Sequence, residues 1–192
     1  MRLLSLTLAV IGLLILPLTS YAKKAAIGPQ SYVELGLGLS QHQAVDKTST
    51  ADTLPQSVAA KILIGGKIMK SSNVWFELMY NYDGKTDYSD TNYEFSSQSV
   101  STGLKLTTSP YKEITGFTRF GGGQTRFNYT NNGSSSSASK FQAYAGAGLG
   151  YRLTKRQYFN FEYQFFHHFD MENGAIDENS GSVFLTYQHY ID

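Results

Sequence analysis

The stretch that most constrains the fold is residues 141–169, FQAYAGAGLGYRLTKRQYFNFEYQFFHHF. Residue character alternates with a period of two, which predicts two β-strands because successive side chains of a strand point to opposite faces. The short polar link Lys155–Gln157 predicts a hairpin between them. One face would carry Ala143, Ala145, Ala147, Leu149, Tyr151, Phe159, Phe161, Tyr163 and Phe165. The other would carry Gly146, Gly148, Gly150, Arg152, Asn160, Glu162 and Gln164.

The glycines of this hairpin share a face with the charged and amide side chains. A charged face that looks at open solvent has no need of missing side chains. Glycines between long charged side chains instead indicate a crowded interior, so the opposite, aromatic face would contact lipid. A membrane barrel, which is turned inside out relative to a soluble one, has this chemistry.

The first 22 residues have the features of an export signal. Arg2 gives a positive start and Leu3–Leu18 an apolar core, and Ser20-Tyr21-Ala22 puts small residues at the two positions that a signal peptidase inspects. We expect cleavage after Ala22, with a retained inner-membrane helix as the alternative. Residues 23–192 would then form one outer-membrane β-barrel domain. Beyond Ala22 there is no run of about 20 apolar residues, so a closed barrel is the remaining way to satisfy the backbone in lipid.

Alternating segments recur along the rest of the chain. They predict strands at residues 31–40, 57–69, 74–83, 93–107, 114–129 and 181–190, besides the two of the hairpin. Long polar loops are expected at residues 41–56, 84–92, 131–140 and 171–180, and tight turns at 70–73, 108–113 and 155–157. The predicted fold class is all-β: an eight-stranded antiparallel up-and-down transmembrane β-barrel. The alternative is a secreted soluble barrel with its large apolar residues inside.

Strand parity assigns the charged and apolar side chains to opposite sides of the wall. The predicted lumen charge network is Glu34, Lys61, Lys67, Glu77, Lys105, Arg119, Arg152 and Glu162. The predicted lipid-facing residues are Leu35, Leu37, Ile62, Ile64, Phe76, Leu78, Leu104, Leu149, Phe161, Tyr163 and Leu185. An eight-stranded lumen is just wide enough for side chains to fill, so we interpret the charges as a satisfied polar core. A plug that rearranges to pass ions is the other interpretation.

The segment 114–129 alternates least regularly. Strict counting past Gly121–Gly123 puts Arg126 on the outer face and Phe127 on the inner one. An arginine facing lipid at the bilayer midplane costs about 2–4 kcal/mol. We therefore expect either a β-bulge at the glycines or a position for Arg126 beyond the hydrocarbon.

Three motifs carry a family resemblance: GFTRFGGG at residues 116–123, Ala145–Thr154, and FEYQ at residues 161–164. In these the chain resembles the OmpA-like transmembrane domain of Gram-negative bacteria. The resemblance implies an eight-stranded barrel with a charged, filled lumen in the outer membrane. Family members often carry an interior acid where this chain has Gly150, and an interior arginine where it has Asn160.

The expected function is structural and surface interaction, of the adhesion or colonisation type, through four extracellular loops on a rigid scaffold. Expected partners are outer-membrane lipids and lipopolysaccharide, the barrel-assembly machinery, and a host or phage surface ligand at the loops. A narrow porin-like channel for ions or small solutes is the alternative. Nucleic acid is not expected, because the net charge is +1 and no basic block occurs.

Enzyme chemistry is not expected. A lipid A-modifying enzyme, the third hypothesis, would need a histidine-activated serine on the lipid-facing wall. Two residues after His167 stands Phe169, and the pair of His168 and Asp170 lacks a nucleophile. No metal or other cofactor is expected, because His167 and His168 would point to opposite faces and the chain has no cysteine.

Overall fold

The computed structural model describes residues 30–46, 56–69, 72–88, 93–131, 134–169 and 176–191. The predicted signal peptide and the tips of the predicted loops lie outside these residues. The described residues form β1 (Ser31–Asp46), β2 (Gln56–Lys67), β3 (Val74–Tyr88), β4 (Tyr93–Thr107), β5 (Ile114–Asn131), β6 (Ser134–Arg152), β7 (Gln157–Phe169) and β8 (Ile176–Ile191).

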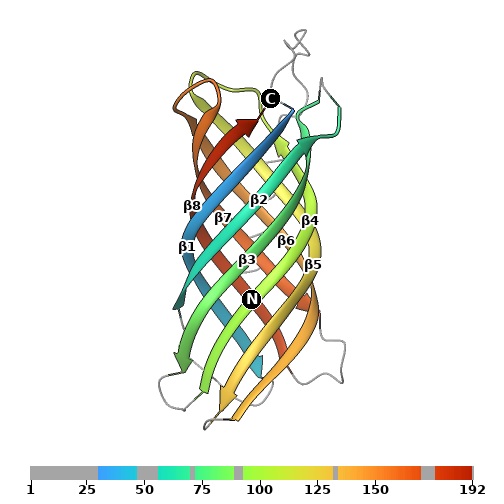
Figure 1. The fold of residues 1–192 in the computed structure, drawn as a ribbon, viewed down its shortest axis with the longest axis vertical. Helices are drawn as coiled ribbons and strands as arrows, with labels where there is room; N and C mark the ends of the chain where they lie inside the picture. The colour runs from blue at the N-terminus through green and yellow to red at the C-terminus, as the bar shows by residue number, and fades with distance from the viewer. Residues whose placement is uncertain are drawn as a thin grey trace.

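The eight strands close into one barrel, in which each strand pairs antiparallel with its neighbour in sequence and β8 pairs with β1 (Figure 1). The predicted fold class is confirmed. No helix in the described part of the chain is long and apolar enough to cross a membrane. We call the end that carries residues 68–69, 72–73, 108–113 and 153–156 the turn end, and the opposite end the loop end.

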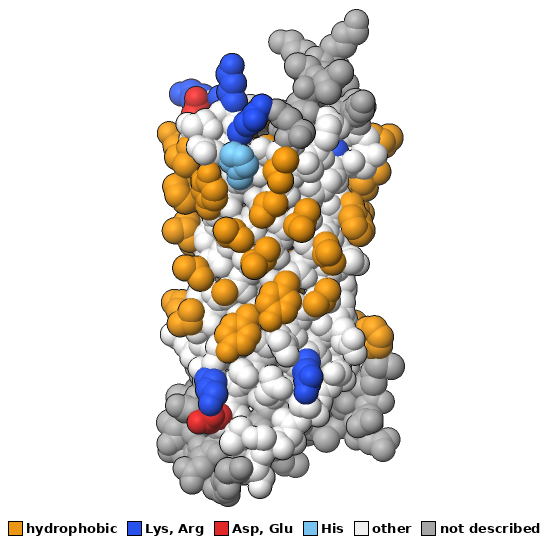
Figure 2. Space-filling view, viewed as in Figure 1, with side chains coloured by type: hydrophobic (Ala, Val, Ile, Leu, Met, Phe, Trp, Pro, Cys, Tyr) orange, Lys and Arg blue, Asp and Glu red, His pale blue; other side chains and the backbone are white. Residues whose placement is uncertain are grey.

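Burial alternates along the strands, and the large apolar side chains are the exposed ones. On the face drawn in Figure 2 they cover the middle of the barrel wall, with Lys and Arg side chains above and below them. Ten predicted lipid-facing residues are exposed: Leu35, Leu37, Ile62, Ile64, Phe76, Leu78, Leu149, Phe161, Tyr163 and Leu185. Leu104 is half-buried. An apolar exterior around a polar interior is the arrangement of a membrane barrel and excludes the soluble alternative.

The strands extend further toward the loop end than the alternation of the sequence predicts. β1 continues to Asp46, β3 to Tyr88, β6 begins at Ser134 and β8 at Ile176. The predicted loops at 41–56, 84–92, 131–140 and 171–180 are therefore wrong over these residues. Outside the hydrocarbon region a strand is held by its backbone hydrogen bonds and needs no apolar outer face. The alternation of apolar and polar residues therefore stops in the sequence although the strand continues.

The ladder between β4 and β5 continues without a break through Gly121–Gly123. The predicted β-bulge at these glycines is wrong, and the irregularity lies in β3 instead, between Asp83 and Thr86. Phe127 is fully buried and Arg126 is exposed, as strict counting requires. The residues paired with Arg126 are Gln98 and Ser139, so its outer-face neighbours are polar and it lies beyond the apolar belt.

Gly121 lies where the backbones of β4 and β5 come close together. A Cβ on Gly121 would stand 2.1 Å from the carbonyl oxygen of Thr102 and 2.6 Å from the Cα of Gly103. Both contacts are with backbone, which cannot rotate away as a side chain can. A Cβ on Gly116, in the same strand, would meet nothing closer than 3.4 Å.

We predict that Gly121→Ala lowers the free energy of unfolding by about 1–3 kcal/mol, because overpacking must shift the β4–β5 ladder. Gly116→Ala is the matched control and should change it by less than about 0.5 kcal/mol. Urea unfolding in detergent micelles, followed by the heat-dependent shift in gel migration, measures both. Equal effects of the two substitutions would contradict the close approach.

Candidate functional site in the barrel lumen

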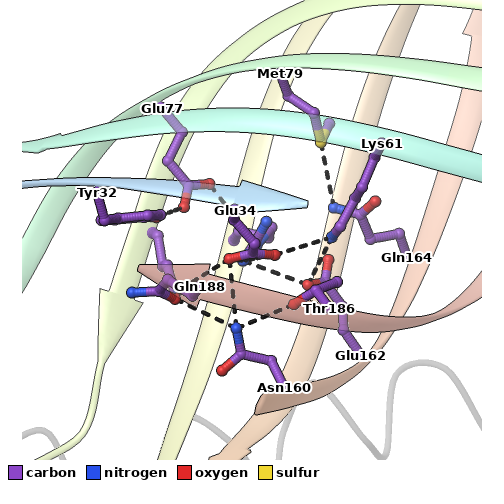
Figure 3. Close-up of polar contacts among 12 residues, drawn as sticks. Tyr32, Glu34, Lys61, Glu77, Met79, Asn160, Glu162, Gln164, Thr186 and Gln188 are labelled. Carbon is purple, nitrogen blue, oxygen red and sulfur yellow. Dashed lines mark hydrogen bonds and ion pairs between the residues drawn. The ribbon is translucent and has the colours of Figure 1, made fainter. Parts of the chain in front are cut away.

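The middle of the lumen holds a cluster of ionised side chains, which come from six different strands (Figure 3). β1 supplies Glu34, and β3 supplies Glu77. The remaining members are Lys61 from β2, Lys105 from β4, Arg119 from β5 and Glu162 from β7. These six side chains, which we call the ion cluster, are between 0 and 2 % exposed.

Arg119 contacts all three carboxylates of the cluster. Its Nη2 lies 3.1 Å from Oε2 of Glu34 and 3.3 Å from Oε2 of Glu162. Its Nε lies 3.7 Å from Oε2 of Glu77. A planar guanidinium presents donors in several directions at once, which suits a residue that must join acids from three strands.

Two lysines complete the charge balance. Nζ of Lys61 lies 2.8 Å from Oε2 of Glu162 and 3.4 Å from Oε1 of Glu34. Nζ of Lys105 lies 3.5 Å from Oε2 of Glu34 and donates to Oε1 of Gln188 at 2.9 Å. Three cations therefore face three carboxylates, so the cluster has no net charge.

Neutral polar side chains surround the cluster. The hydroxyl of Tyr32 donates to Oε1 of Glu77. Nδ2 of Asn160 donates to Oγ1 of Thr186 at 3.0 Å and to Oε1 of Gln188 at 3.3 Å. These bonds link β1, β3, β7 and β8 and fix the orientation of the charged groups. A buried charge is tolerated when it is paired and hydrogen-bonded in this way.

β6 contributes glycines to this level of the lumen and no charge. A Cβ on Gly148 would lie 2.5 Å from Cζ of Phe117, and one on Gly146 would lie 2.9 Å from Cγ of Gln164 and 3.5 Å from Cγ of Arg119. The missing side chains leave room for Phe117 and for Gln164. This is the physical reason why glycines and charges share a face in the sequence.

Two charges of the predicted lumen network lie away from the cluster. Lys67 is half-buried, and its Nζ lies 5.2 Å from the centre of the Trp75 ring. Arg152 is half-buried at the turn end, where its Nη2 lies 3.5 Å from Oε1 of Glu113. The structure therefore brings together six of the eight residues assigned to the network.

Comparison with known proteins places the chain in a family. The family model described as "Outer membrane protein beta-barrel domain" matches residues 7–188. The chain belongs to this family. It is an outer-membrane β-barrel of a Gram-negative bacterium, so the turn end faces the periplasm and the loop end faces the exterior. A search of curated proteins found no match.

Solved structures of this barrel type are similar in fold. Neisserial surface protein A has 13% identity and a TM-score of 0.68, over 84% of this chain and 97% of that one. Ail, the attachment invasion locus protein of Yersinia pestis, has 15% identity and a TM-score of 0.50, over 83% and 99%. The outer membrane enzyme PagL has 14% identity and a TM-score of 0.51, over 83% and 99%. Identities this low show a shared fold only.

Toward the loop end, four ring side chains pack against one another inside the outer-membrane barrel. The sequence interpretation missed this layer. His42 packs edge-on against Phe95 at 4.9 Å, Phe95 against Phe127 at 5.5 Å, and Phe127 against His168 at 4.9 Å. All four are at most 3 % exposed. The inward parity of Phe127 was the sequence signal for this layer, but it was treated as an irregularity.

His167 and His168 lie on opposite sides of the barrel wall. His167 is half-buried, and its Nδ1 lies 2.8 Å from Oδ1 of Asn179 on β8. Asp170, which was weighed as a partner of His168, lies outside the described residues. The contact of His167 with the amide of Asn179 does not place a nucleophile beside the histidine.

A serine, a histidine and an aspartate do meet in the lumen near the loop end. Nε2 of His42 lies 3.3 Å from Oγ of Ser40 and 3.8 Å from Oδ2 of Asp83. One ring nitrogen faces both groups, whereas a catalytic relay uses the two nitrogens of the ring for the nucleophile and the acid. Ser40 is also only 1 % exposed, so this group is part of the polar filling.

We predict that Arg119→Met lowers the free energy of unfolding of the barrel by about 3–5 kcal/mol, because it leaves buried carboxylates without their shared cation. Arg126→Met, at an exposed arginine of the same strand, is the matched control and should change it by less than about 0.5 kcal/mol. Urea unfolding in micelles, followed by the fluorescence of Trp75, gives both values. A similar small change in both variants would show that the cluster does not stabilise the fold.

Proposed function

We propose that the protein is a surface-interaction protein that captures extended polypeptide segments at a free strand edge outside the membrane. The observation that carries the proposal is the pairing of β6. Residues Ser134–Lys140 pair with β5 on one side. The ladder between β6 and β7 begins only at Phe141 and Phe169, so within the described residues no strand pairs with the other side of Ser134–Ser139.

The free edge belongs to a sheet that extends past the closed part of the barrel. The ladder between β2 and β3 ends at Ala59 and Asp83. The other ladders continue further toward the loop end. The β3–β4 ladder ends at the pair Tyr88 and Tyr93, and the β5–β6 ladder ends at the pair Asn131 and Ser134. In Figure 1 the β5–β6 hairpin reaches furthest toward the loop end. A rigid four-stranded sheet therefore projects outward with two edges, one on β3 and one on β6.

The two edges differ in how well they are protected. The β3 edge has an irregularity between Asp83 and Thr86, and its Lys85 forms a 2.6 Å ion pair with Glu94. Bulges and charges of this kind block the addition of another strand. Residues Ser134–Ser139 are exposed and contain neither charge nor proline. The small side chains leave the backbone N–H and C=O groups accessible to a partner strand.

An extended peptide that adds to this edge would gain main-chain hydrogen bonds with little demand on its sequence. Residues 134–140 span about 23 Å at the usual strand rise of about 3.3 Å per residue. Strand addition of this length is a known mode of peptide recognition. The attachment name of Ail supports a surface role, while the neutral cluster across the lumen argues against the channel alternative.

We predict that proline at the free edge weakens peptide capture roughly tenfold, because it removes a donor and clashes with an added strand. Successive N–H groups of a strand point to opposite edges. One of the variants Ser135→Pro and Ser136→Pro therefore removes an N–H group from the free edge, and the other removes one that faces β5. The probe is reduced, carboxymethylated α-lactalbumin, which stays unfolded. Binding of the fluorescent probe to cells that express each variant is the measurement.

Ser137→Thr is the control, because it keeps every backbone group and should bind as the native protein does. Gel migration without heating checks that each variant is folded. The proposal is wrong if both folded proline variants bind the probe as well as the native protein, or if native folded α-lactalbumin binds equally well.

A further inference from the structure

A pocket with a volume of about 140 Å³ opens at the turn end of the barrel. Its inner end is formed by Lys105, Asn160 and Gln188, which also belong to or border the ion cluster. Exposed turn residues, among them Asn73 and Pro110, line its mouth. Because the cluster closes the lumen behind it, the pocket is a dead end that suits binding rather than passage.

The size of the pocket matches a six-membered ring. An apolar cavity of about 150 Å³ in another protein holds one benzene molecule. The space here depends on Gly150, since a Cβ at that position would stand 2.5 Å from Oδ1 of Asn160. A larger side chain at residue 150 would project into the same volume.

The residues that line the pocket indicate what kind of six-membered ring it can bind. Tyr158 and Tyr190 supply aromatic walls, while Asn160 and Gln188 supply amide groups. Phe117 also lines the pocket, but Nζ of Lys105 lies over its ring, 4.4 Å from the centre. Lys105 is the charged residue of the described lining, and it already contacts Glu34 and Gln188. Aromatic faces suit the C–H groups of a ring, and amides suit its hydroxyls. A neutral, polyhydroxylated ring fits better than an anion or a hydrocarbon.

We infer that this pocket binds a single pyranose ring, either as a free sugar or as the terminal unit of a glycan chain, from the periplasmic side. The site lies at the opposite end of the barrel from the proposed peptide edge, and neither inference depends on the other. The aromatic rings contact the C–H face of the sugar, and the amides exchange hydrogen bonds with its hydroxyls.

Trp75 gives a direct readout, because it is the one tryptophan of the chain and is 4 % exposed. Its ring centre lies 5.5 Å from that of Tyr190, which lines the pocket. The full-length protein in detergent micelles is titrated with methyl β-glucopyranoside and methyl N-acetyl-β-glucosaminide. Cyclohexanol, glycerol and acetate are the comparison probes. A saturable change of Trp75 fluorescence is expected with a pyranoside and not with the comparison probes.

Two substitutions in the pocket distinguish sugar binding at this site from unspecific binding elsewhere. Gly150→Val fills the pocket and Tyr158→Ala removes an aromatic wall, so each should weaken pyranoside binding at least roughly tenfold. Tyr151→Ala is the matched control, because Tyr151 neighbours Gly150 in β6 but is exposed on the outer face. Ligand-observed NMR on each variant, with gel migration to check folding, keeps the test valid where fluorescence changes for other reasons.

A soluble N-acetylglucosamine trisaccharide distinguishes the two sources of the ring. Binding of the trisaccharide as tightly as the monosaccharide indicates the end of a glycan chain, and binding of the monosaccharide alone indicates a free sugar. The inference is overturned if neither pyranoside binds, if cyclohexanol or acetate binds as well as the sugars, or if the folded Gly150→Val variant binds them unchanged.

Discussion

The structure depends on the contact of one buried guanidinium with three carboxylates. An eight-stranded barrel has an interior just wide enough for side chains, and a membrane barrel cannot fill it from its apolar residues, because these face lipid. Arg119 joins Glu34, Glu77 and Glu162 across the lumen, and the two lysines bring the sum of charges to zero. The polar interior thereby takes the place of the hydrophobic core of a soluble protein.

The rest of the wall is adapted to this cluster. β6 gives up its inward side chains at Gly146 and Gly148, so that Gln164 from β7 and Phe117 from β5 have room. The opposite face of β6 keeps Leu149 and Tyr151 exposed for lipid. A single alternation in the sequence therefore encodes both the crowding inside and the apolar surface outside. This is clearest in β6 and β7, where the glycines and the charged residues occupy the inward-facing positions of the alternation.

Sequence reasoning was accurate where lipid imposes a pattern and inaccurate where it does not. The turns predicted at 70–73, 108–113 and 155–157, where the alternation stops, agree to within two residues with the described turn residues 68–69, 72–73, 108–113 and 153–156. The strand extensions at Ser134–Lys140 and up to Asp46 could not be found, because serine-rich segments outside the membrane need no alternation. Parity identified Glu34 and Arg119 as inward residues, but not that they touch, since contacts across a lumen depend on strand stagger. The ring layer of His42, Phe95, Phe127 and His168 was missed because the inward parity of Phe127 was treated as an irregularity and His42 fell in a predicted loop.

The barrel thus has an ion cluster at its centre and two chemically different ends: a projecting sheet with a free edge outside, and a ring-sized pocket toward the periplasm. The central claim is that the neutral ion cluster seals the lumen, and planar-bilayer recording of the purified protein tests it most directly. The account predicts no steady single-channel current from the native barrel. A steady current of defined size that changes in the Glu77→Ala or Arg119→Ala variant would contradict it.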